Sequence, residues 1–453
     1  MKKSRLFTGL GLAAMMTFAV AFTACDSETK PAMTELIPNV ITQSQSGTDT
    51  EVPAPATDIN GSTYVTADTK TPEELASIVS DMMTAGTTAP AAVLDTSGNS
   101  ANGTIRSYED KYAYNTLNDT EKALYAHIVD KIQTLGIRVD PEYREVDEET
   151  WDRIYCMVYN QEPQLFWMSP KLDMHGRIYY RSLDREAIKS MQDQIDTTVN
   201  KLLSDMNGMT DFQKLDYINT YLSVNSTFLL GADSADEANY NSTIYNAFAG
   251  GTSKQGDIQC VGYAHAVQYL CDRIGINSMV ITGVTDKGAS HAWNILDLNG
   301  DWYNYDVTWD DPVLDTPNYK NVRHMYMLVP DSWILDRTHF SQNLKFYVDG
   351  SSFKYFDAPV CTATEMNWYK QSGKVYSDKD SAVAELKKQL DNAAANGLRT
   401  TEIMLSDKSV YDAVHAEMKN LQTELKANHS NVKGLSDKSA EVMLVIELDV
   451  IYN

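Results

Sequence analysis

The sequence predicts an α+β protein whose central part is one helix packed on antiparallel strands. A helix is indicated over 260–274, and Gly275 is placed to end it. Its apolar face is made of Val261, Ala264, Val267, Cys271 and Ile274. A strand is indicated at 278–284 by SMVITGV. SHAWNILDL and DWYNYDVTW then flank Asn299-Gly300, the strongest short-range hairpin signal in the chain.

The composition limits the class of partner. The chain has 453 residues, enough for two or three domains, and its formal net charge is −24 from 38 basic and 62 acidic side chains. Such a balance argues against a nucleic-acid partner, because few cations are available to replace the counterions of phosphate groups.

The first 25 residues resemble an export signal, with a basic start, a short apolar core and small residues before a cleavage site. Phe-Thr-Ala-Cys at 22–25 resembles a bacterial lipobox, in which Cys25 would be lipidated. An ordinary secretory signal and an uncleaved anchor are the alternatives. We therefore expect a protein held outside the cytoplasm, with a lipid anchor as its contact with the cell membrane.

Four further regions follow along the chain. Residues 26–106 are rich in Thr, Ser, Ala, Pro, Asp and Gly and are predicted to form a disordered tether. Residues 107–185 are predicted to be a mixed N-terminal region. A helix there starts near Asn118, and strands are indicated at 153–159 and 177–183.

Residues 186–352 are predicted to form the core. It begins with two amphipathic helices, the second capped by Thr210 and Gln213. Residues 362–453 are predicted to form a small βαβαβ module. Its strands are expected at 367–376, 401–406 and 440–450, and its helices at 381–397 and 410–426.

The cysteines are too few for a disulfide scaffold. Besides Cys25 the chain has Cys156, Cys260, Cys271 and Cys361, which allow three pairings. A helix over 260–274 would set Cys260 and Cys271 about 16 Å apart along its axis, beyond disulfide reach. Cys271 is interpreted as a core thiol, and the state of Cys156 and Cys361 stays open.

The hairpin predicts which side chains meet. A two-residue turn at Asn299-Gly300 would place His291, Trp293, Asp306 and Thr308 on one face, which we expect to line a cleft. His291 and Asp306 would be diagonal neighbours, with backbones about 7–8 Å apart. A one-residue bulge would separate them.

A cysteine, a histidine and an aspartate along this stretch could act together in one reaction. Cys260 stands at the first turn of a helix, where free N–H groups and the helix dipole favour thiolate. His291 can exchange the proton of the thiol, and Asp306 can orient and charge the imidazole. The Cys260 backbone N–H is a candidate oxyanion donor.

The sequence motifs around Cys260, His291 and Asp306 are more specific than the three residue types alone. CVGYA at a helix start, SHAWN, and WYNYDVTWDDP resemble the transglutaminase-like superfamily of papain-related thiol enzymes. The motifs cover 255–312. The resemblance implies a papain-related core and catalytic Cys260, His291 and Asp306. It leaves the reaction open, since relatives include cross-linking acyltransferases, peptidases and amidases.

The predicted function is a lipid-anchored thiol enzyme that acts on peptide or carboxamide bonds of a protein or peptide outside the cytoplasm. Hydrolysis and acyl transfer both stay open. A catalytically idle binding or scaffold module on the same fold is the alternative.

We predict neither a metal nor another cofactor. The segment 297–308 lacks the glycine and glutamate of a calcium-binding EF-hand loop. His324 and His339 are interpreted as structural, and His265 as solvated or structural. Tyr263, Trp293 and Trp309 are not placed on the catalytic list. Asp310 and Asp311 are expected to cap or turn the chain.

Overall fold

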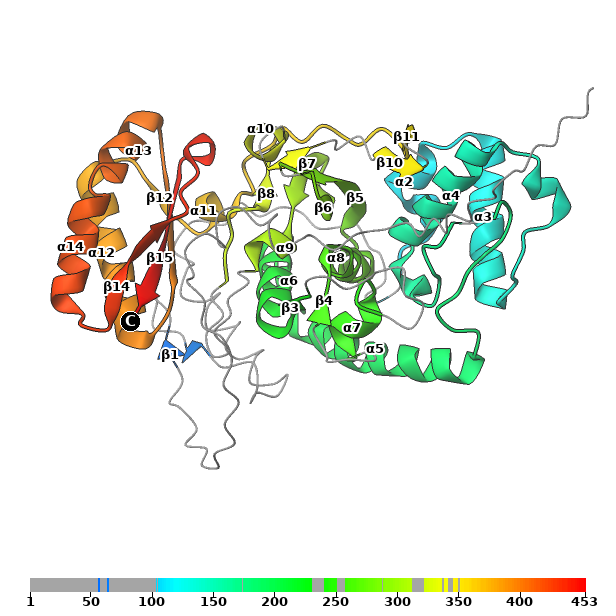
Figure 1. Cartoon of the computed structure of the whole chain (residues 1–453), viewed down its shortest axis with the longest axis horizontal. Coiled ribbons are helices and arrows are strands. Elements are labelled where there is room, and N and C mark those ends of the chain that lie inside the picture. Colours follow the sequence, from blue (N-terminus) through cyan, green and yellow to red (C-terminus); the bar gives the residue numbers. More distant parts are fainter. Residues whose placement is uncertain are drawn as a thin grey trace, which may run out of the picture.

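The computed structural model describes residues 103, 105–172, 174–229, 240–250, 257–286, 288–311, 322–335, 338–340, 345–348 and 351–453. It also describes two short antiparallel strands, β1 (Ala56–Thr57) and β2 (Thr63–Tyr64). The predicted export signal, the lipidation site Cys25 and nearly all of the predicted tether lie outside these residues. Figure 1 shows three groups of elements along the long axis, with a helix-and-sheet body in the middle. Across the described ranges, every helix is too short or too polar to cross a membrane.

The N-terminal group is helical. Its elements are α2 (Tyr112–Asn115), α3 (Asp119–Thr134), α4 (Glu148–Gln161) and short 3-10 turns at Tyr108–Asp110, Pro141–Arg144 and Pro163–Leu165. The predicted start of α3 is confirmed. The Asn118 side chain accepts the Glu121 backbone N–H, and the Glu121 carboxylate accepts the Asn118 backbone N–H. This capping box satisfies two N–H groups that would otherwise lack a partner.

The strands predicted over 153–159 and 177–183 are wrong. The first segment lies inside α4, and the second contributes only two isolated bridges. The Asp147 side chain starts α4 by accepting the Thr150 backbone N–H. All of the helix from 154 to 161 is buried. A helix buried on every side loses the polar stripe that marks helical periodicity, and its apolar run then resembles a strand.

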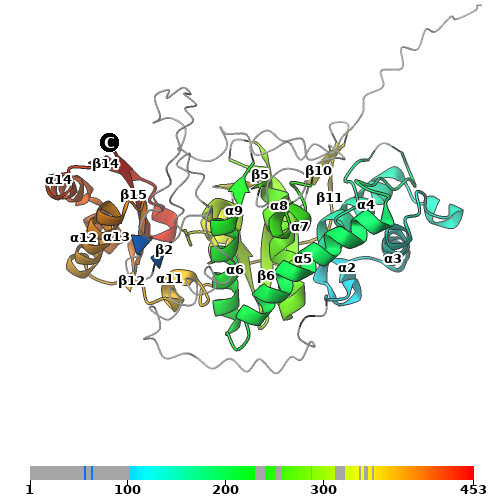
Figure 2. The same cartoon turned by 90° about the horizontal axis from the view of Figure 1, so that it is seen from below.

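The middle group joins helices to a five-stranded antiparallel sheet of order β8-β7-β6-β5-β9. Its strands are β5 (Asn277–Thr285), β6 (Ser290–Leu298), β7 (Asp301–Tyr305), β8 (Met327–Val329) and β9 (His339–Phe340). Its helices are α5 (Arg185–Asp205), α6 (Asp211–Asn225), α7 (Ile244–Phe248), α8 (Cys260–Ile274), α9 (Val307–Asp310) and α10 (Asp331–Ile334). Two further pairs are β3 (Thr227–Phe228) with β4 (Asp257–Ile258), and β10 (Lys345–Val348) with β11 (Ser351–Lys354). Figure 2 shows α8 in the middle of the molecule, where it packs between the sheet and α5 and α6.

The predicted bounds of α8 are confirmed. Cys260 is its first residue, and Gly275 ends it at φ +84°, a left-handed conformation that favours glycine. The Asn294 side chain of β6 donates to the Ala264 carbonyl of α8 at 3.0 Å, which ties the helix to the sheet. The start of α8 is therefore fixed relative to β6.

The two-residue hairpin is also confirmed. Leu298 pairs with Asp301, and Asn294 pairs with Tyr305, in one continuous register without a bulge. Asn299 and Gly300 have φ values of 59° and 90°, as a type I′ turn requires.

The strand after the turn is shorter than predicted. β7 ends at Tyr305, because the Asp306 side chain accepts the Trp309 backbone N–H and caps α9. Thr308 therefore lies on a helix and does not share a strand face with His291. Asp306 stands at the junction of strand and helix, still next to His291.

The C-terminal group is a four-stranded sheet of order β12-β13-β15-β14, in which only β12 and β13 are parallel. Its strands are β12 (Val375–Tyr376), β13 (Thr400–Leu405), β14 (Val432–Asp437) and β15 (Val445–Tyr452). Its helices are α11 (Trp368–Gln371), α12 (Lys379–Asn396), α13 (Lys408–His415) and α14 (Met418–Asn428), with a 3-10 turn at Glu441–Met443. Of the strand predicted over 367–376, only Val375–Tyr376 forms a strand, β12, and Trp368–Gln371 forms the helix α11. The sequence does not predict β14, an edge strand in which only Val432 and Gly434 are buried and a glycine interrupts the apolar pattern.

Buried ion pairs join this module to the middle group. Arg323 contacts Glu447 and Asp449, each at 2.9 Å. His324, interpreted as structural from the sequence, lies 2.6 Å from Glu402 and stacks on Trp368. The same segment reaches the site described below, because the Tyr326 carbonyl accepts the Asp306 backbone N–H at 3.1 Å.

We expect Arg323→Ala to lower the free energy of unfolding by about 3–5 kcal/mol, because it leaves the buried Asp449 carboxylate without its cation and the buried Glu447 carboxyl without its partner. Urea denaturation measures this change. Lys189→Ala is the matched control. It removes an exposed pair with Asp193 at 3.0 Å and should cost less than about 0.5 kcal/mol. A cost for Arg323→Ala no larger than that of the control would contradict the interpretation.

Candidate active site

Cys260 stands at the first turn of α8. The N-cap residue Gln259 donates its backbone N–H to the Asn241 carbonyl at 2.9 Å, which anchors the start of the helix. Gly262 packs against the same carbonyl, and a Cβ there would lie 2.6 Å from the Asn241 oxygen. The glycine of CVGYA is therefore required by a backbone contact. The N-terminal end of a helix, with its positive dipole, favours a negative charge on a cysteine sulfur in the first turn.

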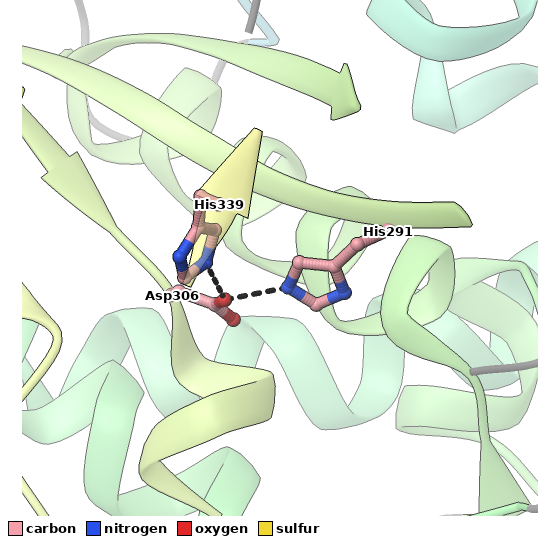
Figure 3. A group of neighbouring side chains, drawn as sticks. All are labelled: His291, Asp306 and His339. Carbon is pink, nitrogen blue, oxygen red and sulfur yellow. Dashed lines mark hydrogen bonds and ion pairs between the residues drawn. The ribbon is translucent and has the colours of Figure 1, made fainter. Parts of the chain in front are cut away.

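His291 joins the thiol to a carboxylate. It lies on β6, and its Nε2 is 2.6 Å from Asp306 Oδ2. Its side chain also hydrogen-bonds Cys260. Because Nε2 is engaged by the carboxylate, Nδ1 is the nitrogen that remains for the sulfur. Figure 3 shows the ring of His291 directed at Asp306.

Asp306 is held through its main chain and both carboxylate oxygens. Its Oδ1 accepts the Trp309 backbone N–H at 3.2 Å. Its Oδ2 lies 2.6 Å from Nε2 of His291 and 2.8 Å from Nε2 of His339. Burial alone would raise the pKa of the Asp306 carboxyl, but His291 and His339 hold that pKa well below its usual range. The carboxylate is therefore ionised and accepts from both rings.

The same contacts set the charge of His291. Burial alone would lower the pKa of its imidazole, but the Asp306 carboxylate and the Cys260 thiol raise that pKa to about 9. The ring therefore carries a proton at neutral pH. An imidazolium beside the sulfur favours the thiolate and can donate to a leaving group.

Sequence reasoning missed one residue of this cluster. His339, interpreted as structural, comes from the two-residue strand β9 and meets the same Asp306 oxygen as His291 (Figure 3). It follows Asp306 by 33 residues, and no motif surrounds it. Only the pairing of β9 with β5 brings it to the site.

The geometry of these three side chains fits a metal poorly. Among the described residues, His291, Asp306 and His339 are the one group of three that could share an ion, with ligand atoms within 4.8 Å. Zinc at about 2.0–2.1 Å from each ligand would set the ligand atoms about 3.3 Å apart. Here the carboxylate oxygen lies 2.6 and 2.8 Å from the two nitrogens. The three atoms therefore contact one another directly.

The site is buried. Cys260 is 4% exposed, and His291 and Asp306 are 1% exposed each. That this face of the hairpin lines a cleft stays a prediction. The rings of Trp293 and Trp309 cover His291, with centroids 5.9 and 5.8 Å from that of the imidazole.

The neighbouring aromatic and acidic side chains have structural partners. The Tyr263 hydroxyl donates to the Asp311 carboxylate. The Trp293 indole N–H donates to the Asn304 side chain at 3.0 Å. Asp310 accepts a backbone N–H from the following segment. Each of these side chains thus has a hydrogen-bond partner beside the cluster of His291 and Asp306.

The other cysteines and His265 belong to the core. Cys156, Cys271 and Cys361 are buried, burial raises the pKa of each thiol, and no disulfide joins the described cysteines. Burial lowers the pKa of His265 to about 4, and its Nδ1 lies 3.0 Å from the Ser242 carbonyl. His265 is therefore structural, and the solvated alternative is wrong.

We expect the His291 ring to titrate near pH 9 and, in Asp306→Asn, to titrate below its ordinary value of 6.5. Without the carboxylate, burial lowers the pKa with less opposition. NMR of the histidine rings, assigned by comparison with His291→Gln, measures both values. The signals of His415, which pairs with Asp437 at 2.8 Å on the surface, should not change in Asp306→Asn. A His291 titration that survives the substitution would contradict the role given to Asp306.

Comparisons with known proteins agree with the architecture. Residues 200–307 match the family model of the transglutaminase-like superfamily. No curated protein matches the chain.

Two solved structures are similar over part of the chain. A "TGase" crystal structure is 16% identical over 28% of this chain and 34% of its own, with a TM-score of 0.22. A "Putative Cysteine Protease from Cytophaga hutchinsonii" is 19% identical over 31% of this chain and 47% of its own, with a TM-score of 0.21. The chain thus spans about a third and about half of their lengths. From the family match and the described elements, residues 200–307 form a transglutaminase-like domain of the α+β class.

Proposed function

We propose that this protein is a cysteine-dependent enzyme that acts on peptide or side-chain carboxamide bonds through an acyl-enzyme on Cys260. The observation that carries the proposal is the position of the His291 ring. It hydrogen-bonds the Cys260 thiol on one side and the ionised Asp306 carboxylate on the other. The superfamily of the domain includes cysteine-dependent peptidases and transglutaminases, which supports an enzyme at this level.

The first half of the reaction forms a thioester. The Cys260 thiolate attacks the carbonyl carbon, and a carbon–sulfur bond forms while the oxygen takes the negative charge. The Cys260 backbone N–H, at the start of α8, donates to that oxygen. His291 gives its Nδ1 proton to the leaving nitrogen, the carbon–nitrogen bond breaks, and the amine departs.

The second half regenerates the enzyme. Neutral His291 takes a proton from a water molecule or a second amine as that group attacks the thioester. The carbon–sulfur bond breaks, and the thiolate returns beside the imidazolium. Asp306 keeps the ring oriented and stabilises its charge in both halves. Water as acceptor gives hydrolysis, and an amine gives acyl transfer.

The proposed setting rests on the sequence of residues 1–25. We propose an exported protein held at the cell membrane by a lipid on Cys25, with protein or peptide substrates outside the cytoplasm. A fatty-acid label that survives Cys25→Ala would count against the anchor.

A peptide assay tests the enzyme proposal. The purified protein is incubated with a library of glutamine-containing peptides, with and without a labelled primary amine, and mass spectrometry detects cleavage, deamidation or amine incorporation. We expect Cys260→Ala to abolish product, and His291→Gln to lower its rate by about 10²–10⁴-fold.

His415→Gln is the matched control, since it removes an exposed histidine–carboxylate pair and should leave the rate unchanged. Product that persists in Cys260→Ala would exclude this thiol as the nucleophile. A library that yields no product would favour the idle binding module.

A further inference from the structure

His339 makes a hydrogen bond to the carboxylate of the proposed triad that the mechanism above does not use. Its Nε2 lies 2.8 Å from Asp306 Oδ2, on the atom that also contacts His291. Its Nδ1 lies 2.8 Å from the Thr338 hydroxyl. The residue is completely buried, so both ring nitrogens have protein partners and neither faces water.

The surroundings of His339 decide its charge and tautomer. Burial lowers its pKa, and the nearby Asp306 carboxylate opposes this only in part. Asp286 adds a weaker attraction, and the protonated His291 ring repels a second positive charge. The ring is therefore neutral and carries one N–H. Because the ionised carboxylate can only accept, this N–H is on Nε2, and Nδ1 accepts from Thr338.

The neutral N–H donor of His339 complements the charged donor of His291. During the proposed reaction His291 gives up a proton and becomes neutral, so its attraction to Asp306 falls. The carboxylate must stay buried and ionised through that interval. The N–H groups of His339 and Trp309 remain on its two oxygens throughout.

We propose that His339 is a positioning residue that holds the Asp306 carboxylate toward His291 and keeps it an acceptor while the charge of His291 changes. This proposal rests on the proposed function of the triad. The proposal adds a fourth side chain to the proposed triad, from the separate strand β9.

Two substitutions separate a hydrogen-bonding role from a packing role. His339→Phe keeps the ring and its contacts with Trp293 and Trp309 (centroids 4.9 and 4.8 Å) but removes the donor. His339→Gln keeps an N–H donor on a chain of similar reach but removes the ring. The readout is the rate of Cys260 alkylation by iodoacetamide at neutral pH, mapped by peptide mass spectrometry, with thermal unfolding of each variant beside it.

We expect His339→Phe to slow alkylation about tenfold or more, on the scale of one hydrogen bond to a charged group, and His339→Gln to stay within about threefold of the wild type. A packing role predicts the reverse order. Thr338→Val keeps the shape but removes the hydroxyl that fixes the tautomer, and should slow alkylation about threefold even if the Phe variant unfolds.

The outcomes also distinguish the two proposals. If the wild type is alkylated no faster than His291→Gln, the proposed triad is wrong, and the proposed role of His339 is wrong with it. If the wild type is faster than His291→Gln, the triad stands. In that case an unchanged rate in His339→Phe, or equal losses in the Phe and Gln variants, overturns the role of His339 alone.

Discussion

The hydrogen bond between the Asp306 carboxylate and the His291 ring is the interaction on which the rest of the site depends. Both residues are almost completely buried, and a buried carboxylate stays ionised only if donors surround it. Here His291, His339 and the Trp309 backbone N–H supply them. The ionised carboxylate in turn keeps His291 protonated, and the charged ring favours a thiolate at Cys260. The negative charge on Asp306 thus maintains the positive charge on His291, which in turn favours a negative charge on Cys260.

This pairing requires several elements to meet. Asp306 is placed by the end of β7 and the start of α9, and its backbone N–H is held by Tyr326. The segment 322–326 is fixed in turn by the buried ion pairs of Arg323 with the C-terminal sheet. The C-terminal module therefore stabilises the chain next to the site, although none of its side chains joins the cluster in Figure 3.

The sequence could predict the local parts of the site, because each is encoded within a few residues. Gly275 ends the helix α8, and Asn299-Gly300 determines the register of the hairpin. His339 could not be found, because only tertiary pairing of a two-residue strand brings it to Asp306. The sequence predicts a strand where α4 lies, because burial on all sides removes the periodic polar positions of a helix. The packing of Trp293 and Trp309 beside the imidazole could not be predicted either, because strand alternation does not encode which rings meet.

The most direct test of the central claim is to trap the acyl group. The protein is mixed with an activated ester of a small acylated amino acid, quenched in acid during turnover and mapped by mass spectrometry. We predict a thioester on Cys260 in the wild type, none on the buried Cys156, Cys271 or Cys361, and a strongly reduced yield in His291→Gln. A wild-type protein without acyl-Cys260, or equal yields with and without His291, would contradict the account.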